Sequence, residues 1–147
     1  MAKTTRITVD AVIVDNDSVV LIKRKNPPFK GMYALPGGFV DYNESVEEAL
    51  VREAKEETGL DVNIERLVGV YSAPGRDPRG HTVSICFLCR VSGGGLAAGS
   101  DAETAEKFKI EHLPKLAFDH KRMIHGCLDK RNTVCLTRQT RVTDAML

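Results

Sequence analysis

The 147-residue sequence has no tryptophan, no long run of apolar residues and almost no excess of charge of either sign. A membrane-spanning helix needs about 20 consecutive apolar residues, so the sequence excludes a helical membrane protein. Twenty-one basic and 20 acidic residues leave a net charge of +1, which gives no global attraction to nucleic acid or to an anionic membrane. We therefore expect a local site for any anionic ligand, and neither nucleic acid nor membrane as a partner.

Cysteine is also scarce, with four residues in the whole chain, Cys86, Cys89, Cys127 and Cys135. The first two have the C-x-x-C spacing of a zinc site, but there is no second close pair, and residues three apart on a strand point to opposite faces. Buried, reduced thiols are therefore the favoured interpretation, and structural zinc is the alternative. The amino-terminal residues show no apolar segment of a secretory signal, and we expect a cytoplasmic protein.

Length and composition predict one domain over residues 1–147, because 28% charged and 42% hydrophobic residues are close to the average for globular domains. Strands before, between and after two helices predict a mixed α/β (α+β) fold, with a mixed sheet sandwiched between helices. The expected strands are 7–15, 19–23, 62–71, 82–91 and a short one near 107–110, and the expected helices are 46–58 and 119–130, the second capped by Asp119. Loops are expected at 26–31 and 93–103, and residues after about 132 are ambiguous.

The first helix has local signals at both ends. Ser45 followed by Glu48 three residues later forms a capping box, and Gly59 supplies a left-handed stop. On a helical wheel of about 100° per residue, Glu53 and Glu57 continue the apolar stripe that begins at Val46. Two acids one turn apart repel each other, so something must offset their repulsion on the side that faces the core.

A divalent cation resolves this anomaly. Glu56 lies about 80° to one side of the pair on the wheel, so three carboxylates can converge, and magnesium prefers such hard oxygen ligands. The competing interpretation is a solvated acidic face, which accounts for Glu47 and Glu48 but leaves the core-side acids unexplained. Arg52, one turn before Glu56, is either a surface ion pair or a strut that orients a ligand carboxylate.

These residues resemble the signature of the Nudix hydrolases. The match covers the fixed glycines, glutamates and arginine of the family over residues 38–60, and Ala54 is the one soft departure, where a larger aliphatic residue is more common. The matching positions are Gly38, Glu44, Arg52, Glu53, Glu56, Glu57, Gly59 and Leu60.

The resemblance extends to the ADP-ribose pyrophosphatase branch of that family. Pro74 lies about fifteen residues after the signature, and residues 116–120 read Leu-Ala-Phe-Asp-His. Tyr33 and the pair Lys107–Phe108 depart from the tryptophans that relatives often carry there, which removes a guide to how the substrate's ring is stacked.

The resemblance implies roles for individual residues. Glu53, Glu56 and Glu57 are the implied metal ligands and catalytic groups with Arg52, and the backbone carbonyl of Gly37 is a further ligand. Gly38, Glu44 and Gly59 are structural positions. The general base is open among Glu57, Glu53, Asp101 and Glu103. Arg76 and Arg79 are candidates for substrate binding, ahead of His81 and His120.

The implied activity is Mg²⁺-dependent hydrolysis of a nucleoside diphosphate derivative, with ADP-ribose split into AMP and ribose 5-phosphate and with Mn²⁺ able to substitute. A pyrophosphohydrolase for oxidised nucleoside triphosphates is the enzymatic alternative. A non-catalytic sensor of ADP-ribose is the alternative from another class. The expected partners are a small nucleotide substrate and a second copy of the chain in a homodimer.

Overall fold

The structure is a computed structural model that describes residues 3–99 and 102–129. The strands form one mixed sheet in the order β3-β2-β1-β6-β5, with β4 paired to β1 and β7 paired to β2. Strands β1 and β6 run parallel, whereas the other pairs are antiparallel. The strands are β1 (Arg6–Asp15), β2 (Ser18–Arg24), β3 (Tyr33–Ala34), β4 (Gly37–Phe39), β5 (Leu60–Tyr71), β6 (Thr82–Gly94) and β7 (Ala102–Lys109).

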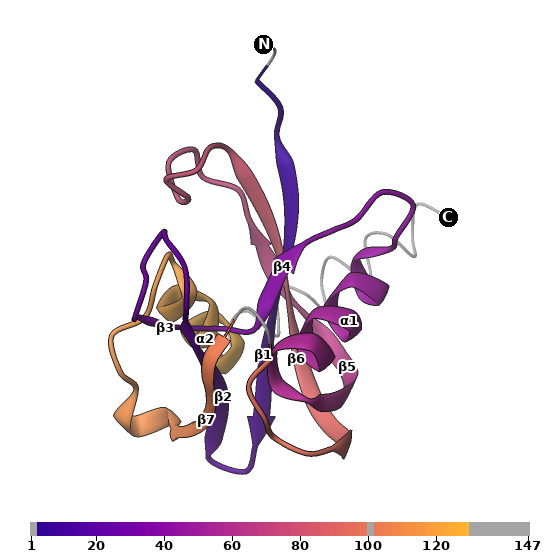
Figure 1. The fold of residues 1–147 in the computed structure, drawn as a ribbon, viewed down its shortest axis with the longest axis vertical. Coiled ribbons are helices and arrows are strands. Elements are labelled where there is room, and N and C mark those ends of the chain that lie inside the picture. Colours follow the sequence, from indigo (N-terminus) through magenta and orange to yellow (C-terminus); the bar gives the residue numbers. More distant parts are fainter. Residues whose placement is uncertain (1–2, 100–101, 130–147) are drawn as a thin grey trace.

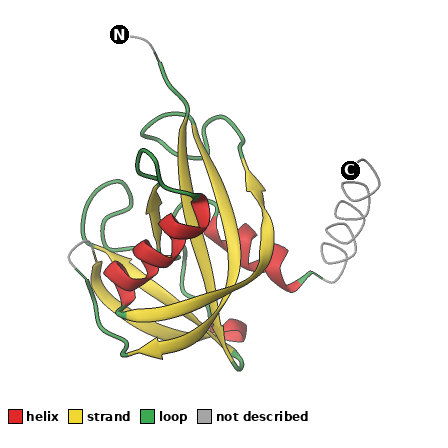
Figure 2. Ribbon diagram, turned by 90° about the vertical axis from the view of Figure 1, so that its right-hand side faces the viewer, coloured by secondary structure: helices red, strands yellow, loops and turns green. Residues whose placement is uncertain are grey.

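Two α-helices cover opposite faces of this sheet (Figures 1 and 2). Helix α1 (Val46–Thr58) packs through Ala49 and Leu50 against one core. Helix α2 (His120–Leu128) packs through Met123 and Ile124 against the other. The predicted sandwich of a mixed sheet between helices is confirmed.

Strand β1 is apolar on both sides because it lies between the two cores. Val9, Ala11 and Ile13 face the α1 side, and Val12 faces the α2 side. Each fully buried valine or isoleucine side chain stabilises the fold by roughly 1.5–3 kcal/mol. Asp10, in the middle of this strand, is also buried.

Helix α1 begins and ends as the sequence predicts. The Ser45 side chain accepts from the Glu48 N–H and the Glu48 carboxylate accepts from Ser45, while Gly59 adopts a φ of 75°. Strand β5 then starts at once with Leu60. The helix is therefore fixed at both ends, which fixes where its acidic side chains lie.

The region after β6 differs from the prediction. Two residues at each end of the loop expected over 93–103 belong to strands, because β6 continues to Gly94 and β7 begins at Ala102. The strand expected near 107–110 is present as the end of β7, which begins earlier than predicted and ends at Lys109. A single 3₁₀ turn, Ile110–His112, follows. Residues 102–106 have weak strand propensity, and they are extended because β2 pairs with β7 along its whole length.

The cysteines behave as buried thiols. Cys86 lies in the core on the α2 side and Cys89 in the core on the α1 side, so the predicted opposite orientation is confirmed. Both are free, as is Cys127, and burial raises the pKa of Cys89 to about 12. Cys135 and the ambiguous tail lie outside the described residues. No helix in the described part of the chain is long and apolar enough to cross a membrane.

Candidate active site

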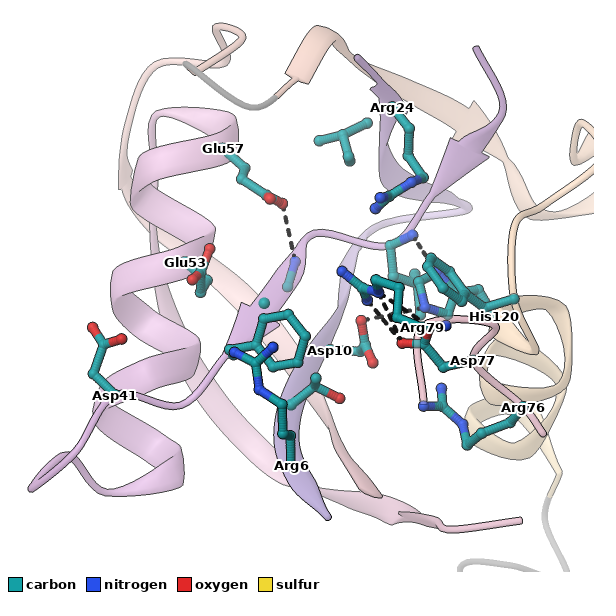
Figure 3. Close-up of a pocket in the computed structure, with 17 residues that line it drawn as sticks. Arg6, Asp10, Arg24, Asp41, Glu53, Glu57, Arg76, Asp77, Arg79 and His120 are labelled. Atoms are coloured by element: carbon teal, nitrogen blue, oxygen red, sulfur yellow. Dashed lines mark hydrogen bonds and ion pairs between the residues drawn. The ribbon is translucent and has the colours of Figure 1, made fainter. Parts of the chain in front are cut away.

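A polar pocket of about 400 Å³ opens between α1, the β1–β4 pair and the segment that leads into α2 (Figure 3). Glu53 and Glu57 line it from the helix, and Gly37 and Gly38 line it from β4. On the other side stand Asp10, Arg24, Arg76, Asp77, Arg79, Phe118 and His120. Acidic and basic groups therefore face one another across the pocket.

The glycines of β4 allow the helix carboxylates to approach the backbone. The Gly37 N–H donates to Glu57 Oε2 over 3.0 Å. A Cβ at Gly38 would lie 2.5 Å from Glu53 Oε1, closer than non-bonded atoms tolerate. Only glycine therefore lets Glu53 lie against this strand.

Arg52 links α1 to the loop that precedes it and to the end of β4. Its Nε and Nη2 donate to the two oxygens of Glu44 at 2.7 and 2.9 Å, and Nη2 also donates to the Phe39 carbonyl at 3.1 Å. This fork lowers the pKa of Glu44 to about 2. Arg52 therefore joins the loop to α1.

Glu56 lies differently from the other two acids of the signature. Its carboxylate bonds Arg52 Nη1 at 3.2 Å and it does not line the pocket, whereas Glu53 accepts from the same nitrogen at 2.9 Å. The structure thus brings two of the three predicted ligands into the pocket and leaves Glu56 beside them. One nitrogen bonds both carboxylates, so Glu56 stays close to Glu53.

The helix wall suits one way of holding a metal. Among the described residues, no three acidic, histidine or cysteine side chains are grouped tightly enough to hold an ion alone. Magnesium is usually bound by one or two protein carboxylates and keeps water and substrate phosphates as its other ligands. Glu53 and Glu57 beside glycine backbone fit that mode, because the glycines leave the space that a side chain would fill.

The opposite wall is fixed by a buried ion pair. Arg76 donates from Nε and Nη2 to Asp119 at 2.9 and 2.6 Å, and from Nη1 to Thr82 at 2.7 Å. Its side chain is 5% exposed. All three guanidinium nitrogens have protein partners, so Arg76 braces the pocket rather than offering a free cation to substrate.

The same contact corrects the prediction for α2. Asp119 occupies the N-cap position, but its side chain makes no capping hydrogen bond, since both oxygens accept from Arg76. A charged, bidentate partner outcompetes a backbone N–H.

Asp10 and His120 form a second buried pair that the sequence analysis did not single out together. His120 Nδ1 accepts from the Leu35 N–H at 2.9 Å and Nε2 lies 3.3 Å from Asp10 Oδ1, while the Ser84 hydroxyl donates to the other Asp10 oxygen. Burial raises the pKa of Asp10 to about 7 and lowers the pKa of His120 to about 3. The signal that points to Asp10 is an acid in the middle of a strand, directly between the apolar residues Val9 and Ala11.

Arg79 stands between two aromatic rings at the pocket mouth. Its guanidinium carbon lies 4.8 Å from the centroid of Phe39 and 5.5 Å from that of Phe118. Bonds to both oxygens of Asp77 hold it there. Its side chain is 39% exposed, so of the two predicted substrate-binding arginines it is the accessible one.

Glu103 and His81 do not line the pocket. Glu103 forms a 4.0 Å ion pair with Lys23 and is exposed. Asp101 lies outside the described residues. His81 bonds the Thr5 hydroxyl and the Ser72 carbonyl beside the pocket rather than in it.

Comparison with known proteins decides which family has this arrangement. A family model described as the NUDIX domain matches residues 4–127. The chain belongs to the Nudix family. An ADP-ribose pyrophosphatase of Methanocaldococcus jannaschii is 56% identical to this Nudix chain over 126 residues, which are 86% of this chain and 75% of that protein.

Solved Nudix structures share the fold. A bifunctional NMN adenylyltransferase/ADP ribose pyrophosphatase from Francisella tularensis, complexed with AMP and a manganese ion, aligns with a TM-score of 0.79 and 28% identity over 86% of this chain and 42% of that one. The NUDIX domain of NrtR from Shewanella oneidensis, complexed with ADP ribose, aligns with a TM-score of 0.73 and 29% identity over 86% and 88%. This chain is therefore a Nudix hydrolase, and its signature forms the β4 strand, the following loop and α1.

Proposed function

We propose that this Nudix hydrolase splits ADP-ribose into AMP and ribose 5-phosphate, with Mg²⁺ as its ion and Mn²⁺ as a substitute. The observation that carries the proposal is the placement of Glu53 and Glu57 against the backbone of Gly37 and Gly38 in a pocket whose far side carries Arg24 and Arg79. Similarity to an ADP-ribose pyrophosphatase over most of the chain supports the substrate.

The metal site would be made by Glu53 and Glu57, with the Gly37 carbonyl and Glu56 as further ligands. When bound, a divalent ion neutralises phosphate charge and lowers the pKa of a water molecule. Arg52 positions Glu53 and Glu56 through one nitrogen, so it sets the separation of their carboxylates.

Hydrolysis forms a bond from a water oxygen to one phosphorus and breaks the bond from that phosphorus to the bridging oxygen. Glu57 or Glu53 would take the proton of the attacking water, since both lie in the pocket. Glu103 is a weaker candidate because it lies outside the pocket in an ion pair with Lys23. Arg79 would neutralise the phosphates from the opposite wall.

Two alternatives share this site. An oxidised nucleoside triphosphate would use the same carboxylates, and a sensor would bind ADP-ribose without cleaving it. A pair of carboxylates held against backbone glycine favours turnover over sensing, because binding alone does not require acids that repel each other.

The deciding experiment measures AMP release from ADP-ribose and pyrophosphate release from 8-oxo-dGTP, each with Mg²⁺, Mn²⁺ or excess chelator. We expect a higher kcat/KM for ADP-ribose, complete loss of turnover in chelator, and recovery with either ion. Full turnover in chelator would contradict the metal mechanism. A better kcat/KM for the triphosphate would contradict the substrate but not the reaction class.

Three further expectations remain proposals. The buried thiols of Cys86, Cys89 and Cys127 support a reducing location such as the cytoplasm, which cell fractionation tests. A homodimer is tested by light scattering of the purified chain. The single domain proposed over residues 1–147 is tested by limited proteolysis.

A further inference from the structure

A second cavity lies beside the catalytic pocket and shares a wall with it. Its volume is about 590 Å³, within the usual range for small-molecule sites. It lies between the amino-terminal end of β1 and the β5–β6 loop, which project side by side in Figure 1. The backbone N–H of Arg6 donates to the His81 carbonyl at 3.1 Å and joins the two segments.

The shared wall is a stack of cations on one aromatic ring. The Arg6 guanidinium lies 3.5 Å from the centroid of Phe39, and that of Arg79 lies 4.8 Å from the same centroid. All three residues line both cavities. Phe39 directly follows Gly38, the residue against which Glu53 lies, so the partition stands next to the catalytic carboxylates.

The chemistry of the two cavities differs. The second cavity is lined by Lys3, Thr4, Thr5, His81 and Thr82 beside the shared wall, with no acidic residue among its lining residues. Hydroxyl, imidazole and cationic groups recognise hydroxyls and phosphate.

The far end of the catalytic pocket is aromatic instead. Arg24 lies 5.1 Å from the centroid of Phe118, and the Phe29 ring packs against Phe118 at 4.7 Å. Such stacked surfaces suit a planar base. A diphosphate bound through the proposed metal site of Glu53 and Glu57 would therefore have a surface for a base on one side and a polar, cationic cavity on the other.

We propose that the second cavity binds the sugar-phosphate arm of the substrate, the arm opposite the base, across the Arg6–Phe39–Arg79 partition. This assignment rests on the proposed cleavage of a nucleoside diphosphate sugar. It makes Lys3, Thr5 and Arg6 specificity-determining residues, since they contact the part of the substrate that a plain nucleoside diphosphate lacks.

The first test separates the two arms. Backbone amide shifts of the full chain are followed by NMR with Mg²⁺ while ribose 5-phosphate or AMP is added. We expect ribose 5-phosphate to shift the amides of Thr5, His81 and Thr82, and AMP to shift those of Arg24 and Phe118. Shifts of the first group by AMP, or none of them by ribose 5-phosphate, would overturn the proposal.

The second test uses variants of the cavity. Lys3→Gln and Thr5→Val should each raise the KM for ADP-ribose at least about fivefold, the loss expected for one hydrogen bond, and should change the inhibition constant of ADP by less than about twofold. Thr104→Val is the matched control, since its hydroxyl bonds Glu106 outside both cavities. Unchanged KM values overturn the second site alone, whereas a parent enzyme that does not cleave ADP-ribose overturns the proposed function.

Discussion

The two walls of the catalytic pocket handle charge in different ways. On the α1 wall, Glu53 and Glu57 are acids one turn apart on the same helix face. On the opposite wall, Arg76 is matched with Asp119 and His120 with Asp10 inside the protein. The acids of the α1 wall still repel each other although Glu53 pairs with Arg52, and a bound cation would relieve this repulsion. On the opposite wall, Arg76 and Asp119 neutralise each other.

This difference between the walls predicts which substitutions reduce activity and which reduce stability. Changes on the α1 wall should reduce activity and leave folding intact, because its acids repel one another when no cation is bound. Changes on the opposite wall should reduce stability, because a buried charge that loses its partner is costly.

The largest expected effect is a loss of stability from a change on the opposite wall. Arg76→Met leaves the Asp119 carboxylate without its bidentate partner and should lower the free energy of unfolding by about 3 kcal/mol. Urea denaturation measures this loss. Arg90→Ala, which removes the exposed ion pair with Glu65, should cost about 1 kcal/mol or less. Equal costs for the two variants would erase the distinction between the walls.

The next largest effect is a loss of activity from a change on the α1 wall. Glu57→Gln keeps an oxygen that accepts from the Gly37 N–H but removes charge, so kcat should fall at least about a hundredfold. In chelator the variant should be as stable as the parent or more so. Glu47→Gln, an exposed acid of the same helix, should leave kcat unchanged. An active Glu57→Gln enzyme, or one that has unfolded, would move catalysis away from this helix.

A smaller effect is expected where the loop and α1 are joined. Arg52→Lys keeps the positive charge but loses the two-pronged contact with Glu44, so kcat should fall by about tenfold, as for other groups that orient metal ligands. Magnesium should also raise the melting temperature less than in the parent. Arg90→Lys is the matched control in an exposed ion pair. A variant with the parent's kcat would show that Arg52 does not position the acids.

The acids of the α1 wall could be predicted from the sequence, because the signals that place them are local. The capping box at Ser45, the stop at Gly59 and the helical period fix which side of α1 carries Glu53 and Glu57. No such pattern shows that Glu56 is held by Arg52 outside the pocket, since that depends on the rotamers of both side chains.

The contacts of the opposite wall could not be predicted from the sequence, because the residues that pair there are far apart along the chain. Arg76 and Asp119 are 43 residues apart, and His120 and Leu35 are 85 apart. Residues 102–106 were not predicted as strand for the same reason, since β2 supplies the pairing. Long-range pairing overrides local propensity. The sequence therefore predicts α1 and its acids better than it predicts the opposite wall of the pocket.

The last prediction tests the balance between Asp10 and His120 through pH. Burial keeps His120 neutral in the folded state by lowering its pKa from 6.5 to about 3. The unfolded chain therefore binds more protons at this site between about pH 3 and 6.5, and stability from His120 is lost as pH falls.

Burial acts on Asp10 with the opposite sign, because its pKa rises from 3.8 to about 7. The folded state then holds the extra proton, and stability from Asp10 is lost as pH rises through that window. Between about pH 4 and 6.5 the two slopes oppose each other, which keeps the stability of the parent nearly flat with respect to this pair.

Asp10→Asn removes one slope and keeps one acceptor oxygen for His120, while its amide nitrogen takes the place of the oxygen that accepts from Ser84. Its free energy of unfolding, measured in urea with chelator at pH 4.5, 5.5 and 6.5, should rise with pH relative to the parent by about 1 kcal/mol per pH unit, below the limit for one proton. Asp61→Asn, an exposed acid, should show no such difference. Parallel pH profiles for Asp10→Asn and the parent would show that the protonation of Asp10 does not offset that of His120. That result would contradict the charge balance proposed for the opposite wall.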